Sequence, residues 1–341
     1  MELESKKVLV TGVTGYVGAW VGYKLIEEGK YQVTGTVRNK DDQNTIDVLR
    51  EGYKDKFDSL NLVNMDLNDS ESIINAIEGF DYVVHVASPF PSDSPEDASE
   101  LIDPAVNGTK AVLEGCLKHK IQRLVVTSSV VAIYEFEKGD VTLDETTFAT
   151  VKDTHDTYTK SKILAEAEIW KFVEENKDNE EKTEVTVLNP GFVLGPLKIN
   201  KSSTSAGLAI ALMSGGGVEL PPVIAPAINV CNLADAHVKA LVNKPGRYCM
   251  GYDSYALSEL AQFLEEEFKP KGYDVKFSTL PKSAFENRTD IDGKYVYSRA
   301  DVKVVLDSKK IKEEFGMEFT DIKTTLKEMG ESLIEFGVVK T

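Results

Sequence analysis

Tyr158 and Lys162 are the residues whose types and spacing best suit proton-transfer chemistry in this sequence. They stand four positions apart in Tyr-Thr-Lys-Ser-Lys, so on a helix they would share one face. A phenol has an ordinary pKa of about 10, too high for efficient proton exchange at neutral pH, and a neighbouring ammonium lowers it by favouring the phenolate. Alone, such a pair is more typical of a solvated helix face. Ser129 follows a predicted strand and adds a hydroxyl that could bond a substrate carbonyl oxygen while Tyr158 protonates it.

A second chemical feature is the glycine-rich stretch near the N-terminus. Glycines 12, 15 and 18 follow an apolar run at residues 8–10 and open a helical pattern that begins at Tyr16. A strand, a glycine turn and a helix N-terminus together bind anions, because backbone N–H groups can approach a pyrophosphate and the helix dipole is positive there. The first two glycines are one residue further apart than in the usual dinucleotide fingerprint. Placement after a strand and before a helix still favours a pyrophosphate site over a plain tight turn.

Arg38 indicates which dinucleotide is preferred. It stands at the end of the second predicted strand, where an acidic residue would bind the 2′-hydroxyl of NADH and an arginine accommodates the 2′-phosphate of NADPH. The alternative is a solvated surface charge, and Asp41 and Asp42 nearby disfavour a phosphate. We expect NADPH to be preferred.

The elements that must position these residues alternate along the first 190 positions. The apolar patterns predict strands at 8–10, 31–37, 60–65, 81–86, 121–127 and 185–188, and helices at 16–28, 41–50, 70–77, 101–118 and 157–173. This alternation implies right-handed βαβ units and a parallel sheet covered on both faces. The predicted fold class is therefore α/β, a Rossmann-type doubly wound parallel sheet.

The pattern changes after Pro190. Residues 196–226 are rich in loops around a short helix at 206–213, and further helices are predicted at 232–242, 258–268 and 321–336. We expect residues 1–195, with 227–252 returning to them, to form the dinucleotide-binding domain. Residues 196–226 and 253–341 would form a smaller substrate-binding lobe over the carboxyl edge of the sheet, where open α/β sheets bind ligands.

Composition excludes several classes of protein. Among 341 residues, 56 acidic and 39 basic side chains give a formal net charge of −17, which repels nucleic acid and anionic membrane surfaces. The start of the chain has no signal-peptide pattern, and no apolar run is long enough to span a membrane. Three widely separated cysteines suggest buried thiols and a cytoplasmic location. The four histidines lack metal-ligand spacing, so we predict no metal, and we expect His155 to lie at the surface.

Three motifs then carry a family resemblance. Residues 11–18 (TGVTGYVG), 125–129 (VVTSS) and 158–162 (YTKSK) resemble the extended short-chain dehydrogenase/reductases. Four further segments, 85–90, 103–109, 188–196 and 306–316, resemble the dihydroflavonol-reductase-like branch, and within it the fungal NADPH-dependent carbonyl reductases of the methylglyoxal type. The likeness spans almost the whole chain.

The resemblance implies a role for individual residues. Tyr158 would donate the proton, Lys162 would act as its electrostatic partner and bind the nicotinamide ribose, and Ser129 would polarise the carbonyl. The implied cofactor-binding residues are Gly12, Gly15, Tyr16, Val17, Gly18, Arg38, Asp66, Leu67, Val86, Ala87, Ser88, Thr127, Tyr158, Lys162, Pro190, Val193 and Ser205. Asn107 would organise a water behind Lys162, or else cap or pack a helix.

The expected activity is NADPH-dependent reduction of a ketone or aldehyde to an alcohol. The expected substrate-binding residues are Phe90, Ser129, Tyr134, Tyr158 and Phe192, apolar enough to select by shape. Members of the family that reduce flavonoids carry an asparagine where this chain has Tyr134, and cinnamoyl-CoA reductases carry an aromatic-rich segment where it has residues 155–157. Neither plant substrate is therefore expected. The partner would be a small carbonyl compound, and the protein a monomer or homodimer. The alternatives are a non-catalytic dinucleotide sensor and a nucleotide-sugar epimerase of the same fold.

Overall fold

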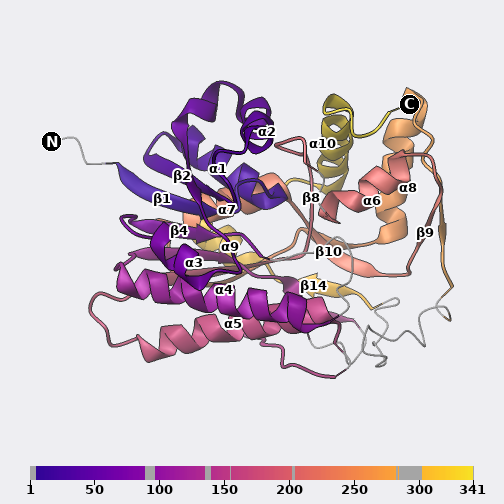
Figure 1. The fold of residues 1–341 in the computed structure, drawn as a ribbon. Helices are drawn as coiled ribbons and strands as arrows, with labels where there is room; N and C mark the ends of the chain where they lie inside the picture. The colour runs from indigo at the N-terminus through magenta and orange to yellow at the C-terminus, as the bar shows by residue number, and fades with distance from the viewer. Residues whose placement is uncertain are drawn as a thin grey trace.

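A seven-stranded parallel sheet forms the centre of the computed structural model (Figure 1). Its strand order is β11-β7-β5-β4-β1-β2-β3, with every neighbouring pair parallel. The strands are β1 (Lys6–Thr11), β2 (Tyr31–Val37), β3 (Leu60–Asn64), β4 (Tyr82–His85), β5 (Arg123–Thr127), β7 (Glu184–Pro190) and β11 (Gly246–Met250). The expected α/β class and parallel sheet are confirmed. The sequence patterns predicted six of these strands, and β11 adds a seventh at the edge beside β7.

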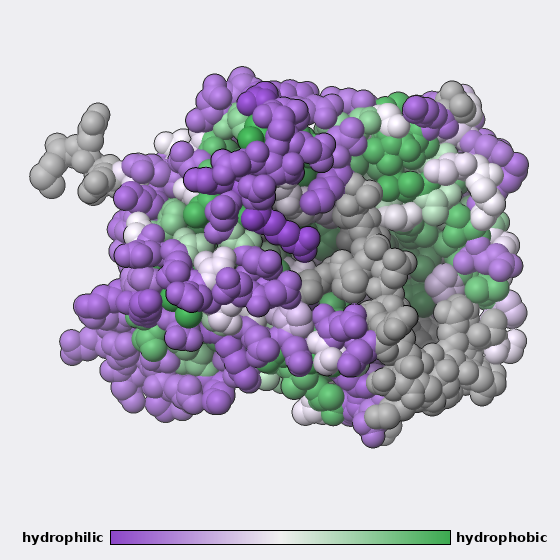
Figure 2. All heavy atoms as spheres, in the orientation of Figure 1, coloured by the Kyte–Doolittle hydropathy of each residue, from purple (hydrophilic) through white to green (hydrophobic). Residues whose placement is uncertain are grey.

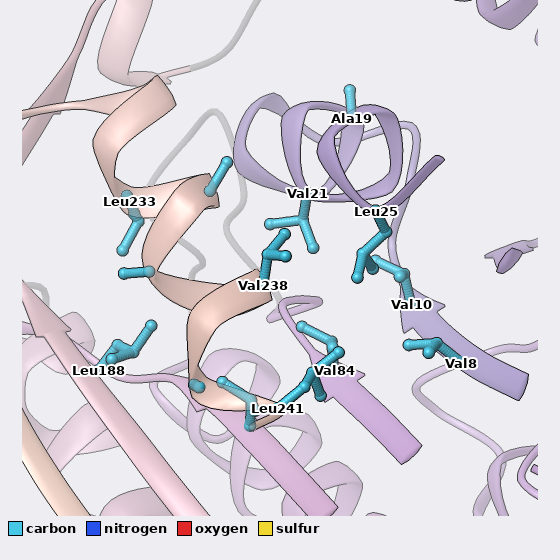
Figure 3. Packing of buried hydrophobic residues seen from close by; sticks show 14 of the residues in the cluster. Val8, Val10, Ala19, Val21, Leu25, Val84, Leu188, Leu233, Val238 and Leu241 are labelled. Atoms are coloured by element: carbon cyan, nitrogen blue, oxygen red, sulfur yellow. The ribbon is translucent and has the colours of Figure 1, made fainter. Parts of the chain in front are cut away.

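Helices cover both faces of this sheet, because its strands are apolar on both sides. Along β1, Val8 and Val10 belong to one core cluster while Leu9 belongs to another on the opposite face. The first face carries α1 (Tyr16–Glu28), α2 (Gln43–Tyr53), α7 (Val230–Ala240) and α9 (Lys309–Phe315); Figure 3 shows α1 and α7 meeting the strands there. The second carries α3 (Ser70–Ala76), α4 (Ser99–Lys118) and α5 (Thr157–Glu175), the last two side by side.

Further helices lie beyond the carboxyl ends of the strands (Figure 1) and enclose a separate hydrophobic cluster. It is built by α6 (Thr204–Met213), α8 (Leu257–Phe268) and α10 (Ile322–Glu335). Small sheets join this region: β8 (Phe192–Leu194), β10 (Ile224–Asn229) and β12 (Asp253–Ala256) form one, β9 (Val218–Leu220) and β13 (Phe277–Thr279) a second, and β6 (Val141–Leu143) and β14 (Val304–Leu306) a third. The division into two domains remains a prediction, and α9 of the C-terminal part packs in the first core.

The structure describes residues 5–88, 97–134, 140–153, 155–201, 204–281, 283 and 302–340. The side chains of residues 204 and 205 are also outside what it describes. Predicted and observed boundaries of the main elements differ by only a few residues, as helix and strand ends usually do. Of the three cysteines, all of them free thiols, Cys116 and Cys249 are buried and Cys231 is partly buried.

Candidate active site

The glycine turn between β1 and α1 is closely packed. Gly12 has a φ of +72°, a left-handed conformation that L side chains rarely adopt. A Cβ at Gly18 would lie 2.2 Å from the carbonyl oxygen of Gly12, so α1 can approach the turn this closely only with glycine there. Gly15 is the N-cap of α1 and has no side chain with which to cap it. The first N–H groups of α1, from Tyr16 to Gly18, have no acceptor within the helix and suit an anion.

The end of β4 is fastened to this turn by Thr11. Its hydroxyl accepts hydrogen bonds from the backbone N–H groups of Val86 and Ala87, each at 3.0 Å, and lies 3.0 Å from Nδ1 of His85. With both lone pairs occupied, the hydroxyl donates to Nδ1, which assigns the ring proton to Nε2. Burial lowers the pKa of His85 to about 4, and the charge of Lys162 adds to this shift. His85 is therefore neutral at pH 7.

Tyr158 and Lys162 lie on α5 at the same edge of the sheet. Asp156 caps this helix by accepting a hydrogen bond from the Thr159 N–H at 2.7 Å, which begins α5 just before the tyrosine. Lys162 Nζ lies 5.8 Å from the centre of the Tyr158 ring. Burial lowers the pKa of Lys162 to about 8, while the carboxylate of Glu166 acts in the opposite direction. The expected pairing on one helix face is what the structure shows.

Ser129 lies beside this pair because of the turn that follows β5. It is the N-cap of a short 3₁₀ helix, η2 (Val130–Ala132), and its Oγ accepts the N–H of Val131 at 3.4 Å. The side chain is buried, with 8% of its surface exposed. Val130 and Val131 share a hydrophobic cluster with Tyr158, and η2 packs against α5. The structure therefore brings Ser129, Tyr158 and Lys162 into one region.

A small cavity of about 20 Å³ shows that this region adjoins the strand ends. It is lined by residues following β3 and β4, by the end of β5 and by α4 and α5, among them Leu67, His85, Ala87, Ser88, Thr127, Ser128 and Lys162. Its volume is enough for about one water molecule. Lys162 thus lines one cavity together with residues predicted to bind the cofactor.

The predicted 2′-phosphate residue, Arg38, is exposed just after β2. Asp42, whose charge would oppose a phosphate, is engaged as the N-cap of α2 and accepts from Thr45 N–H at 3.1 Å. Lys201 was not predicted here, and the structure brings it into electrostatic range of Arg38: burial, and then the charge of Arg38, lower the pKa of Lys201. No local pattern in the sequence marks this second cation.

The remaining predicted residues are dispersed around the same edge. Asp66 is exposed, and its Oδ1 accepts the N–H of Asn68 at 2.9 Å. Thr127 Oγ1 lies 2.7 Å from Nε2 of His237. Pro190 ends β7 and Val193 pairs with Ile228, so both lie where the sheet meets the C-terminal region.

Besides Ser129 and Tyr158, two of the predicted substrate residues can be placed and one cannot. Phe192 is partly buried and packs against the C-terminal cluster. Tyr134 is almost fully buried, in the cluster that contains Tyr158. Phe90, and the side chain of Ser205 predicted to contact phosphate, lie outside the described residues.

The expectation that His155 lies at the surface is wrong. Only 2% of its surface is exposed, and its Nδ1 accepts the N–H of Lys152 at 3.4 Å. The turn before α5 folds back, with the N–H of His155 bonded to the carbonyl of Lys152 at 3.1 Å, and this carries the ring inward. Asn107 is exposed on α4 beside a larger cavity that Leu67 also lines.

Within the described ranges, no group of three or more His, Cys, Asp or Glu side chains is arranged to hold a metal ion. None of the helices in the described part of the chain combines the length and apolar character needed to cross a membrane.

A buried ion pair behind the Ser129 turn was not predicted from the sequence. Glu166 and Arg247 are 3% and 4% exposed at the side chain, and Arg247 Nε lies 2.6 Å from Glu166 Oε1. Glu166 follows Lys162 by four residues, as Lys162 follows Tyr158, so a three-member stripe on one helix face was a usable signal.

The fold and this site define an extended short-chain dehydrogenase/reductase: a doubly wound sheet, a glycine turn at α1, and a Ser, Tyr and Lys set beside it. The model of the NAD dependent epimerase/dehydratase family matches residues 8–246, and the chain belongs to that family. The resemblance based on the motifs is therefore confirmed.

Individual relatives cover nearly the whole chain. Cinnamoyl-CoA reductase CAD2 of Medicago truncatula is 32% identical over 339 residues, which span 96% of this chain and 95% of that protein. Dihydroflavonol 4-reductase of Dianthus caryophyllus is 30% identical over 285 residues, 80% of this chain and 77% of that protein.

Solved structures agree with the fold. Yeast methylglyoxal/isovaleraldehyde reductase Gre2 complexed with NADPH has a TM-score of 0.79 and 25% identity, covering 97% of this chain and 99% of that one. Vestitone reductase from alfalfa has a TM-score of 0.72 and 26% identity, covering 98% and 100%.

Proposed function

We propose that this protein reduces ketones or aldehydes to alcohols with NADPH. The observation that carries the proposal is that Tyr158 and Lys162 lie on α5, which packs against the turn of Ser129, at the sheet edge where Ala87 adjoins the glycine turn. Similarity to reductases along nearly the full chain, one of them solved with NADPH, supports both the reaction and the cofactor.

The residues present fit a dinucleotide. A Cβ at Gly12 would lie 3.0 Å from Cβ of Ala87, and a Cβ at Gly18 would collide with the Gly12 carbonyl. The close packing of the turn against α1 and the end of β4 therefore depends on both glycines. The N–H groups of Tyr16, Val17 and Gly18 would hold the pyrophosphate, and Arg38 the 2′-phosphate. When bound, NADPH supplies a hydride to the substrate carbonyl carbon.

The side chains of this chain would handle the proton. Ser129 would donate a hydrogen bond to the carbonyl oxygen, and Tyr158 would give that oxygen a proton as negative charge develops. The Lys162 ammonium would stabilise the resulting phenolate and bind the nicotinamide ribose. Asp66, Leu67, Val86, Ala87, Ser88, Thr127, Pro190, Val193 and Ser205 would complete the cofactor site in this proposal.

An apolar carbonyl compound is the substrate class that the surroundings favour. Phe192 and the apolar side chains of α6 belong to the C-terminal cluster, and hydrophobic residues gather on the face over α6, α8 and α10 (Figure 2). A substrate site lined by apolar side chains would select substrates by shape. Each ill-fitting methylene group changes the discrimination between two substrates by about 1–3 kcal/mol. Tolerance of several ketones and aldehydes is therefore expected.

A second candidate is reduction of an aromatic CoA thioester, favoured by the 32% identity to a cinnamoyl-CoA reductase. The two candidate reactions would use the same cofactor, the same fold and the same residues, Ser129, Tyr158 and Lys162. They differ in whether the substrate carries a CoA leaving group. Sugar epimerisation and cofactor sensing without catalysis both predict no net loss of NADPH, because epimerisation returns the hydride to the sugar.

The test is a substrate panel in which loss of NADPH absorbance is followed. It spans aryl ketones, β-keto esters, 2-oxoaldehydes, CoA thioesters and nucleotide sugars. We expect turnover with members of the first three classes. Activity confined to CoA thioesters would select the second candidate. No loss of NADPH with any class would leave the sensor and the epimerase, which analysis of the nucleotide-sugar products separates.

Cofactor preference is tested in the same assay. We expect a higher kcat/KM with NADPH than with NADH, and a selective loss of the NADPH value in Arg38→Ala. Lys201→Ala tests whether the second cation near Arg38 contributes. Equal kcat/KM for the two cofactors in the unmodified protein would contradict the proposed NADPH preference.

A further inference from the structure

Glu166 is a buried carboxylate on the helix that carries Tyr158 and Lys162. Its partner Arg247 lies at the start of β11, 81 positions away in the chain. Both side chains are less than 5% exposed. Charged side chains are rarely buried unless they are paired and hydrogen-bonded, so this pair must be held by specific contacts.

Each oxygen of the Glu166 carboxylate accepts two hydrogen bonds. Oε1 accepts from Arg247 Nε at 2.6 Å and from Trp170 Nε1 at 3.0 Å. Oε2 accepts from the Ser128 hydroxyl and from Asn189 Nδ2 at 2.7 Å. Four donors match the four acceptor positions of an ionised carboxylate. A glutamine amide would place its own N–H₂ group against two of these donors.

These contacts hold the turn that carries Ser129 at three points. The Ser128 hydroxyl bonds Glu166 directly. Asn189 Nδ2, which also bonds Glu166, donates to the carbonyl of Ser129 at 3.1 Å. Arg247 Nη2 donates to the carbonyl of Ala132 at 3.1 Å. The backbone on both sides of the Ser129 side chain is thus tied to one ion pair.

Arg247 is itself held rigidly. Its Nη1 donates to the carbonyls of Thr147 and Glu145, and its guanidinium lies 4.0 Å from the centre of the Phe148 ring. A planar guanidinium can serve these directions at once, whereas a lysine ammonium is a single point charge.

We infer that Glu166 and Arg247 are a positioning pair, which holds the Ser129 turn in register with the helix that bears Tyr158 and Lys162. The inference rests on the proposed carbonyl reduction and assigns that site two residues that do not contact substrate. A hydroxyl displaced by about 1 Å from the carbonyl oxygen loses much of its effect on the transition state, so the pair acts on turnover through Ser129.

The first experiment compares Glu166→Gln with Glu168→Gln. Glu168 stands on the same helix, is partly exposed and pairs with Lys110 of α4 at 3.1 Å, so it controls for the substitution itself. We expect Glu166→Gln to lower kcat about 10²-fold, as loss of one transition-state donor does, with the NADPH Kd within about threefold of the unmodified value. Glu168→Gln should leave both unchanged. A folded Glu166→Gln protein with full kcat would overturn the inference.

A double variant separates positioning from general loosening of the fold. In a Ser129→Ala background, Glu166→Gln should cause little further loss of kcat, because the group it positions is already gone. The rates are compared at pH 6, because loss of the Glu166 carboxylate also lowers the pKa of Lys162. A further loss as large as in the unmodified background would show that Glu166 does not act through Ser129, and would also overturn the inference.

Two milder variants cover the case in which Glu166→Gln does not fold. Ser128→Ala removes one of the four donors to Glu166. Arg247→Lys keeps the positive charge but loses the planar guanidinium with its several N–H donors. Both should lower kcat with little change in NADPH Kd, and unchanged kcat in both would contradict the inference.

If the unmodified protein reduces no carbonyl in the panel, the proposed function fails. If it does so and only Ser129→Ala is impaired, the positioning pair alone is wrong.

Discussion

At Lys162, burial and a neighbouring carboxylate act on one ammonium in opposite directions. Burial dominates and brings its pKa to about 8, while Glu166 limits the shift. The group is still charged at pH 7, next to the Tyr158 ring. A charge in this position favours the phenolate, which is what a tyrosine needs to exchange a proton near neutrality.

Replacing Tyr158 tests this chemistry at one residue. Tyr158→Phe keeps the ring and removes the proton, so kcat for carbonyl reduction should fall by about 10²-fold or more, with NADPH affinity little changed. Tyr252→Phe, at a tyrosine with 41% of its surface exposed, is the matched control and should match the unmodified protein. A Tyr158→Phe protein with most of its turnover would refute the assignment of the proton donor.

The pKa of Lys162 also predicts a pH profile. The lysine is protonated below about pH 8 and neutral above it, so the stabilisation of the phenolate is lost as pH rises through that value. We expect kcat/KM for NADPH, which reports groups of the free protein, to fall above about pH 8. Initial rates between pH 6 and pH 9.5 measure this, and a flat profile over that range would be evidence against it.

Among the elements, α1 joins two parts of the proposed site. The N-terminus of α1 follows the glycine-rich turn directly. Side chains of α1 donate hydrogen bonds to the backbone that follows β8. Tyr16 donates to the carbonyl of Gly195 at 2.6 Å, and Trp20 Nε1 donates to the carbonyl of Pro196 at 2.7 Å. Burial raises the pKa of Tyr16 well above its ordinary value, so the hydroxyl remains a donor. Movement of α1 at the glycine turn should therefore reach Gly195 and Pro196.

Gly18→Ala tests the close approach of α1 to the turn. The added Cβ would meet the Gly12 carbonyl oxygen at 2.2 Å and force the turn apart. NADPH Kd should rise about tenfold or more, equivalent to losing one charge-assisted hydrogen bond of about 1.5–3 kcal/mol. Fluorescence titration measures the Kd. Gly216→Ala is the control, since a Cβ there meets nothing within 4 Å, and unchanged affinity in Gly18→Ala would argue against a cofactor at this turn.

For the whole molecule, two buried histidines link stability to pH. His85 joins the ends of β1 and β4, and His237 joins α7 to β5 through Thr127. Burial lowers the pKa of each to about 4. The unfolded chain takes up these protons near pH 6.5 and the folded protein only near pH 4, so stability is lost as pH falls across that interval.

Urea unfolding at pH 7 and pH 5 measures this effect. The free energy of unfolding should fall by about 2 kcal/mol for each histidine between these values, from the two pKa values and about 1.4 kcal/mol per unit. His237→Gln should show a smaller pH dependence than the unmodified protein. Equal pH dependence in His237→Gln would contradict a protonation-linked loss at that residue.

Local patterns in the sequence by themselves determined the fold class, six of the seven strands, the glycine turn and the Tyr158–Lys162 pair. Apolar periodicity and glycine spacing reflect nearest neighbours along the chain, and parallel α/β topology then brings strand ends to one edge. The structure confirms the parallel sheet and the shared location of these residues; their roles are the subject of the tests above.

Only the tertiary structure decided which polar residues enter the core. Glu166 and Arg247 are charged types that are almost never fully buried unless paired, and histidine is intermediate. Apart from the position of Glu166 four residues after Lys162, nothing within a few positions of these three residues marks them as buried. Burial of a charge is tolerable only where donors or acceptors reach it, and three of the four donors to Glu166 come from β11, from β7 and from the turn after β5, while Trp170 is the one donor from its own helix. Such partners are assembled by folding, across 81 positions for the ion pair, and so lie beyond any local reading of the chain.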